Sequence, residues 1–254
     1  PSQAVYDTLA SGMDIDCGGF LDKYLAAAIN DTTVPIAVVN NALFNLFMVQ
    51  YRLGLFDEAS AQPYRSIPLS SINTAAHQEL ALSAAQQGIT LLKNSNGALP
   101  LSSGSVKNVA VVGPHGNASQ ILIGNYEGTP PYIVTPLEGI SSYAPASSYS
   151  EGCDVSCSSD SGFADAVNLA KSADATVIII GIDEHVESEG HDRTSIALPG
   201  MQNEFVSQVA AAAKGPVTVV VLSGGALDIS AIRDNDKVSS IMWAGYCGQS
   251  GGQA

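Results

Sequence analysis

The run ATVIIIGI at residues 175–182 decides how the rest of the sequence is interpreted. It is continuously apolar and rich in β-branched residues, which is typical of a strand buried on both faces of a parallel sheet. Three further runs have the same character and end in glycine: VKNVAVVG (106–113), PVTVVVLSG (216–224) and VSSIMWAG (238–245). We therefore expect a central sheet in the second half of the chain.

Segments with helical spacing alternate with these runs. They are TPLEGISSYA (135–144), GFADAVNLAKSA (162–173), PGMQNEFVSQVAAAA (199–213) and ISAIRDN (229–235). Alternation of this kind predicts an α/β fold with a mostly parallel sheet and helices on both faces. Ligands of such sheets bind at the carboxyl ends of the strands.

The first 57 residues have a different pattern, with three expected helices at 4–12, 20–30 and 35–54 and a short strand at 13–19. The helix at 35–54 is apolar at almost every phase, so we expect it to be buried. Pro and Ser then dominate a linker, which continues into a helix near 72–88, with Asn73 or Thr74 as its cap. The expected organisation is a first segment 1–57, a linker 58–86 and an α/β domain 87–254.

Composition excludes several classes of partner. The net charge is −14 and the isoelectric point about 4.4, so nucleic acid and anionic membranes would be repelled. No apolar run approaches the roughly 18 residues of a membrane span. We expect a small neutral ligand instead, and the sequence leaves the oligomeric state open.

Four cysteines and two sequons bear on the compartment. Cys153 and Cys157 are close in sequence with no further metal ligand nearby, which favours a disulfide over a zinc site. Cys17 and Cys247 are either free thiols or pair outside this chain. The sequons at Asn30 and Asn117 are compatible with glycosylation. Together these features favour a secreted protein.

The loop GIDEHVESEGHDR (181–193) follows the central strand and carries five carboxylates, namely Asp183, Glu184, Glu187, Glu189 and Asp192. Crowded carboxyl groups hold a proton more tightly, which suits a general acid. A metal site is less well supported, because the calcium-loop spacing is absent, and a solvated acidic loop remains the alternative. Glu187 and Glu189 are two residues apart, so only one should face a cleft. We expect Asp192 and Arg193 to form local ion pairs or to fix the loop.

Other chemical motifs are weak. The glycine-rich turns match neither a dinucleotide fingerprint nor a phosphate loop, so we expect no cofactor. The four histidines are scattered and no nucleophile elbow is present. Trp243 either stacks on a sugar beside Tyr246 or packs in the core, as a strand Trp usually does.

Several stretches, in order along the chain, together resemble glycoside hydrolase family 3, and in particular its fungal β-xylosidase branch. They are SGMDIDCG (11–18), YRLGLFD (51–57), QQGITLLKNSNGALPL (86–101), VAVVGPHGNAS (109–119), GNYEGTPPYIVTPLEGI (124–140), EGCDVSC (151–157), ESEGHDR (187–193), ALPGMQNE (197–204) and WAGYCGQSGG (243–252). The resemblance implies that residues 1–57 are the C-terminal end of a β/α barrel, followed by most of an α/β sandwich domain.

The resemblance also implies a function: a retaining exo-1,4-β-xylosidase that releases xylose from non-reducing ends of xylo-oligosaccharides. The acid/base residue would be Glu189, with Glu187 as the second candidate. No aspartate matches the family's nucleophile position, so we expect a fragment that is inactive alone. The alternatives are a β-glucosidase or α-L-arabinofuranosidase of the same family and, in another class, a non-catalytic carbohydrate-binding module.

Overall fold

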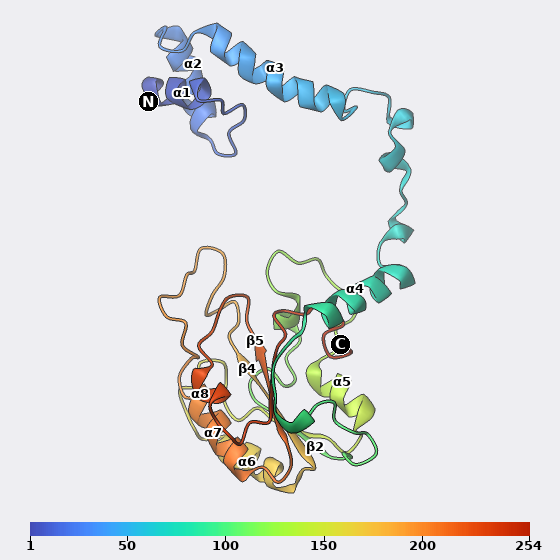
Figure 1. Ribbon diagram of the computed structural model, residues 1–254. Helices are drawn as coiled ribbons and strands as arrows, with labels where there is room; N and C mark the ends of the chain where they lie inside the picture. Colours follow the sequence, from blue (N-terminus) through green and yellow to red (C-terminus); the bar gives the residue numbers. More distant parts are fainter. The chain divides into compact units, whose positions relative to one another are not determined.

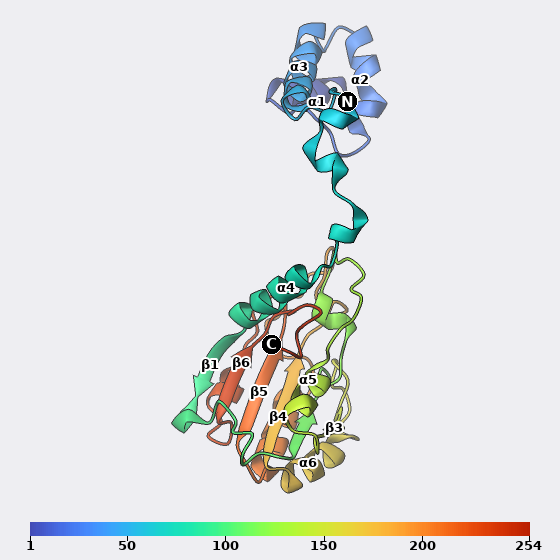
Figure 2. The same ribbon diagram turned by 90° about the vertical axis from the view of Figure 1, so that its right-hand side faces the viewer.

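The computed structural model describes all 254 residues and divides them into two compact units, Pro1–Ser71 and Ile72–Ala254 (Figures 1 and 2). Each unit has a core of its own, and each is described by itself below. No helix in either unit combines the length and apolar character that crossing a bilayer requires.

The first unit is helical, with α1 at Ser2–Ala10, α2 at Phe20–Asn30 and α3 at Ile36–Arg52, followed by the short 3-10 turns Ala59–Ala61, Pro63–Ser66 and Leu69–Ser71. Its small core joins all three helices through Val5, Leu9, Ala28, Val34 and Ala42.

Two expectations for the first unit are wrong. Residues 13–19 form no strand, since no neighbouring strand is present to pair with them; instead Asp16 accepts hydrogen bonds from the backbone of Gly18 and Leu21. Helix α3 is largely exposed, with Ala42 as its only buried residue, because within this unit α1 and α2 cover only one side of it.

The second unit contains a six-stranded sheet in the order β1-β6-β5-β4-β2-β3. The strands are β1 Thr90–Asn94, β2 Val109–Val112, β3 Ser148–Ser150, β4 Ala175–Gly181, β5 Val217–Leu222 and β6 Ser240–Trp243. All neighbours pair in parallel except β1, which runs antiparallel to β6 at the edge. The four strands expected from apolar runs are confirmed, and so is the mostly parallel α/β fold; β1 and β3 were not expected.

Helices cover both faces of this sheet (Figures 1 and 2). On one face lie α6 (Phe163–Ser172), α7 (Gln202–Ala212) and α8 (Ser230–Arg233), whose apolar side chains share the main core with β4 and β5. On the other face lies α5 (Pro136–Tyr143), which packs in a smaller core. Helix α4 (Ala75–Gly88) precedes β1 and begins at the N-cap Thr74. Every residue of β4 is buried, as expected for a central strand.

Candidate active site

Gly181 is the last residue of β4, so the acidic loop begins after it and comprises residues 182–193. Gly181 closes the strand with a φ of +139°, a conformation that side chains disfavour, and a Cβ there would lie 1.9 Å from the Leu222 carbonyl oxygen. Only glycine therefore allows the ends of β4 and β5 to lie this close. As a result the acidic loop starts beside the loop that follows β5, Ser223–Leu227, which it contacts through Arg193.

Two turns shape the acidic loop. The Asp183 carbonyl oxygen accepts hydrogen bonds from the amides of Val186 and Glu187 (3.0 and 3.1 Å), so the backbone folds back on itself. Ser188 and His191 then exchange two backbone hydrogen bonds (3.1 and 2.9 Å) and form a tight hairpin turn. Glu189 lies at the tip of this turn and is exposed. The turn thus separates the two candidate glutamates, with Glu187 before it and Glu189 at its tip.

Glu187 is half-buried and held by Arg193. The Arg193 Nε donates to Glu187 Oε2, and the arginine side chain is only 12% exposed. Arg193 also donates to the carbonyl oxygen of Ala226 (2.6 Å) in the loop after β5. Arg193 forms a local ion pair within the loop, as expected, and its partner is Glu187, whereas Asp192 is exposed.

Gly225 gives the Glu187–Arg193 pair its space. A Cβ at position 225 would lie 2.6 Å from Glu187 Oε1 and 3.0 Å from Arg193 Nη2. Real Cβ atoms essentially never come within 3.0 Å of another heavy atom, so any side chain here would displace the pair. The loop after β5 therefore leaves just enough room for a carboxylate of the loop after β4.

Tyr246, from the loop after β6, lies close to the same carboxylates. Its ring is close to Gly124 and Gly224, where an added Cβ would lie 3.3 and 3.2 Å from ring carbons. Burial raises the pKa of Tyr246, and the negative charges of Asp183, Glu187 and Glu184 raise it further. Neither the Tyr246 hydroxyl nor Glu184 Oε1 has a hydrogen-bond partner although both atoms are buried. Three carboxylates and a phenol thus share one partly buried region.

His115 lies behind the acidic loop, in the turn after β2. It is buried, and desolvation lowers its pKa to about 4, although the charge of Asp183 and a hydrogen bond with the backbone of Ile182 act in the opposite direction. Its Nε2 has no partner. Sequence reasoning treated this histidine as one of four scattered ones and missed its position beside the start of the loop.

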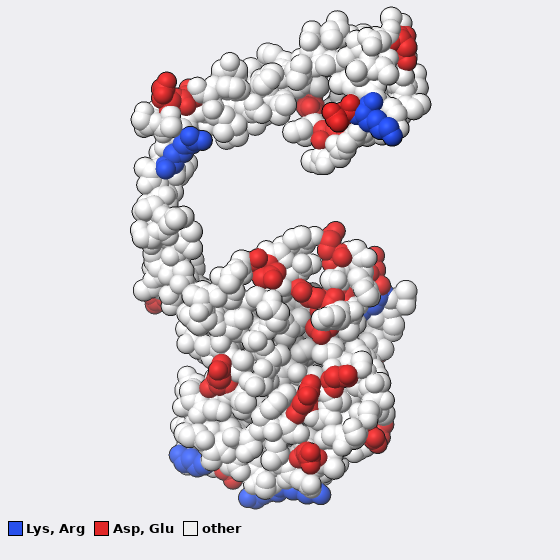
Figure 3. All heavy atoms as spheres, turned by 180° about the vertical axis from the view of Figure 1, so that it is seen from behind, with Lys and Arg blue, Asp and Glu red and all other residues white.

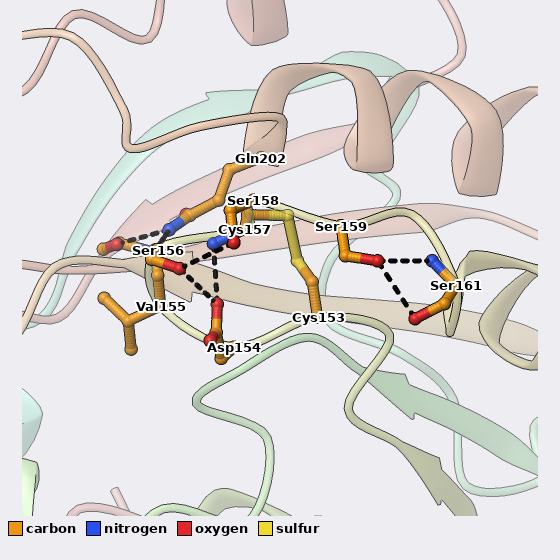
Figure 4. The surroundings of a disulfide bond; sticks show 10 residues. Cys153, Asp154, Val155, Ser156, Cys157, Ser158, Ser159, Ser161 and Gln202 are labelled. Carbon is orange, nitrogen blue, oxygen red and sulfur yellow. Dashed lines mark hydrogen bonds between the residues drawn. A yellow bond between two sulfur atoms is a disulfide. The ribbon is translucent and has the colours of Figure 1, made fainter.

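The remaining expected side chains have structural roles. Trp243 donates a hydrogen bond from Nε1 to Ser223 Oγ (3.0 Å) and packs against the main core, which fits the core interpretation. Cys153 and Cys157 form the expected disulfide (Figure 4), while Cys17 and Cys247 are free. Figure 3 shows how strongly acidic side chains outnumber basic ones on the face of the second unit that it draws. No group of three or more His, Cys, Asp or Glu side chains is arranged to hold a metal ion.

Residues 89–254 match the glycosyl hydrolase family 3 C-terminal domain. The chain belongs to glycosyl hydrolase family 3. Over its whole length it is 45% identical to beta-xylosidase/alpha-L-arabinofuranosidase 1 of Medicago sativa subsp. varia, of which it covers 33%. It is 40% identical to the probable exo-1,4-beta-xylosidase bxlB of Aspergillus oryzae, of which it covers 31%. The chain therefore spans about a third of the length of the curated relatives that it matches.

Solved structures of the family have the same fold. A GH3 exo-beta-xylosidase (XlnD) in complex with a xylobiose aziridine probe superposes with a TM-score of 0.92 at 36% identity, covering 99% of this chain and 32% of that one. A β-glucosidase from Erythrobacter marinus superposes with a TM-score of 0.84 at 27% identity, covering 99% and 37%. The family 3 resemblance and the sandwich fold expected from the motifs are thereby confirmed.

Proposed function

We propose that this chain supplies the acid/base loop of a retaining exo-β-xylosidase that releases xylose from the non-reducing ends of β-1,4-xylo-oligosaccharides. One observation carries the proposal: a half-buried, arginine-held glutamate sits at the carboxyl end of the central strand, in a chain 40–45% identical to β-xylosidases. The fold alone would not support an activity, because the same fold serves several glycosidases. The proposal therefore rests on the site together with the relatives.

Two carboxyl groups perform this reaction. One protonates the glycosidic oxygen while the other attacks the anomeric carbon, and in retaining enzymes they lie about 5–5.5 Å apart. The first residue then removes a proton from the water that releases the sugar. We propose that the acidic loop contributes this acid/base residue. No aspartate of this chain matches the family's nucleophile position, so we expect the 254-residue chain alone to hydrolyse no aryl β-xyloside above background.

The geometry favours Glu187 over Glu189 as the acid/base, although the motif spacing favours Glu189. Glu187 is half-buried and fixed, whereas Glu189 is exposed at the hairpin tip. Arg193 contacts Oε2 of Glu187 and holds this carboxyl group in place.

Leaving-group dependence tests the proposal. We expect Glu187→Ala in the full-length enzyme to lower kcat/KM on phenyl β-xyloside by about 10²–10⁴-fold and to affect 2,4-dinitrophenyl β-xyloside far less, because only the poor leaving group needs a proton. Glu189→Ala is the matched control. If Glu189→Ala alone shows this pattern, Glu189 is the acid/base. If neither variant shows it, neither Glu187 nor Glu189 is the proton donor.

A second specificity is favoured by the Medicago relative, whose name includes α-L-arabinofuranosidase. We propose that the same site releases arabinofuranose as well as xylose. Comparing kcat/KM of the full-length enzyme on aryl xylosides, arabinofuranosides and glucosides decides between these specificities. A preference for glucosides would assign the protein to the β-glucosidases, such as the Erythrobacter marinus enzyme that it resembles in fold.

We also propose that the protein is secreted and glycosylated. A disulfide persists in oxidising compartments, and both sequon asparagines, Asn30 and Asn117, are exposed. Mass spectrometry of the protein recovered from its native source, before and after enzymatic deglycosylation, tests this. Unmodified asparagines at both positions would count against glycosylation.

A further inference from the structure

We propose that Gln202 is a positioning residue that holds the start of the acidic loop in place. Its side chain hydrogen-bonds both the end of β4 and the loop closed by the Cys153–Cys157 disulfide. The inference rests on the proposed function, because it concerns where that function's proton donor is held. It arises from a buried hydrogen-bond cluster that includes no carboxylate of the acidic loop.

Gln202 is fully buried at the first position of α7. Its Oε1 accepts a hydrogen bond from the Gly181 amide (3.0 Å). Its Nε2 donates to the carbonyl oxygens of Gly181 (2.8 Å) and Val155 (2.7 Å). Both amide hydrogens and the oxygen of this side chain are therefore used, which is what a buried amide requires.

The side chain takes the place of a missing strand neighbour. On one side, β4 pairs with β5 up to Gly181 opposite Leu222, whereas on the other side its pairing with β2 stops at Ile178. The amide and carbonyl of Gly181 would be left unpaired on that second side, and the Gln202 side chain satisfies both. Leaving buried backbone groups unpaired is unfavourable, so this contact holds the last residue of the strand in place.

The other end of the cluster is the disulfide loop (Figure 4). Val155 lies between the two bonded cysteines, and the Cys157 carbonyl oxygen accepts a hydrogen bond from the Met201 amide (2.9 Å). Two carbonyl groups of the disulfide loop are thus bonded to the start of α7. Gly200 has a φ of +47°, and a Cβ there would lie 2.1 Å from the Ser156 carbonyl oxygen, so the two segments are in close contact.

This hydrogen-bond cluster influences the acidic loop because Gly181, which belongs to the cluster, is the residue directly before the loop. Gly181 immediately precedes the loop, and Glu187 follows it by six residues, with its own amide bonded to Asp183. A shift of Gly181 therefore moves the turn on which Glu187 is held. Displacement of a reacting group by about 1 Å can reduce a rate on the order of 100-fold.

The test compares Gln202→Met with Gln208→Met in the full-length enzyme. Methionine has a similar length but none of the three hydrogen bonds. Gln208 is the matched control, because it is an exposed residue of the same helix whose amide donates to Glu204 (3.0 Å). We expect Gln202→Met to lower kcat/KM on phenyl β-xyloside by about 10- to 100-fold. On 2,4-dinitrophenyl β-xyloside the expected loss is within about threefold, and Gln208→Met should match wild type on both substrates.

Amide hydrogen exchange supplies a readout that needs no activity. We expect faster exchange over residues 181–187 in Gln202→Met and unchanged exchange in Gln208→Met. Equal losses on both xylosides, or unchanged exchange in this segment, would overturn the proposal. If Gln202→Met does not fold, Gln202→Glu is measured in the same way, because it keeps an acceptor for the Gly181 amide and, as a protonated carboxyl group, can donate to only one of the Gly181 and Val155 carbonyl oxygens.

Failure of the proposed function looks different. In that case Glu187→Ala and Glu189→Ala both leave the leaving-group dependence of the wild type unchanged, whatever the exchange data for Gln202→Met show. If one of the glutamate variants does steepen that dependence while Gln202→Met leaves it and the exchange rates unchanged, the function stands and the positioning role of Gln202 is refuted.

Discussion

Gly225→Ala probes whether the loop after β5 sets the position of Glu187. Position 225 has an ordinary backbone conformation, so alanine introduces no φ strain there. The new Cβ would lie 2.6 Å from Glu187 Oε1, and ordinary van der Waals contact begins at 3.4 Å. The carboxylate must therefore retreat by roughly 0.8 Å, taking the Arg193 contact with it.

That retreat should cost activity rather than stability. The displaced atoms are the ends of flexible side chains, so we expect the free energy of unfolding to change by less than about 1 kcal/mol. If Glu187 is the proton donor, the shift should lower kcat/KM on phenyl β-xyloside by about 10- to 100-fold. The loss on 2,4-dinitrophenyl β-xyloside should be much smaller.

The assay is steady-state kinetics of the full-length enzyme on both xylosides, together with thermal unfolding. Gly104→Ala is the matched control, because it adds the same methyl group where the nearest atom, Ser102 Oγ, is at an ordinary 3.5 Å. Wild-type kinetics in Gly225→Ala would refute the reasoning. So would an equal loss on both substrates accompanied by a large drop in Tm, since that would indicate general destabilisation.

Three further outcomes follow from buried features of the second unit. The double variant Cys153→Ser/Cys157→Ser should lose about 2 kcal/mol of unfolding free energy, which corresponds to about 4–8 °C in Tm. The control Cys17→Ser, which replaces an exposed free thiol, should leave Tm unchanged, and equal Tm values for the two variants would contradict this prediction. Thr135→Ala removes the N-cap of α5, in which the Glu138 amide donates to Thr135 Oγ1 (3.2 Å) and the Thr135 amide donates to Glu138 Oε2 (2.8 Å). The variant should lose about 1 kcal/mol of unfolding free energy, measured by urea denaturation, and an unchanged urea midpoint would count against this. Burial lowers the pKa of His115 from 6.5 to about 4, so between these pH values the histidine is neutral in the folded protein and protonated in the unfolded one. The free energy of unfolding should therefore fall by about 3 kcal/mol as the pH drops from 6.5 to about 4. His115→Gln should lack this pH dependence, and an equal dependence in the variant would refute the prediction.

Much of the second unit could be predicted from local sequence. Continuous apolar runs form the strands β2, β4, β5 and β6. Such runs are expected wherever helices cover both faces of a parallel sheet, so they could be recognised without knowledge of distant contacts. Strand β1 was not predicted because it lies at the edge of the sheet. Four of its five residues are exposed, so its sequence TLLKN is not the continuous apolar run of a buried strand. Strand β3 is only three residues long.

The candidate site could be predicted only in part. Charge density and the preceding strand located the acidic loop, because both are local properties of the sequence. The sequence indicated a local ion pair for Arg193 but not its second contact, with the Ala226 carbonyl oxygen, because that residue is more than 30 positions away in a loop that the sheet brings close. Gln202 was missed for the same reason: its three hydrogen bonds reach segments 21 and 47 residues distant.

The complete burial of β4 has a consequence for how this fold can change its chemistry. A strand whose seven residues are all enclosed tolerates few substitutions, and its final glycine is fixed by contacts on two sides. Beyond that point the chain is exposed at the hairpin tip, where insertions and replacements disturb no packing. Substitutions and insertions should therefore be tolerated at the hairpin tip around Glu189 and disruptive within β4.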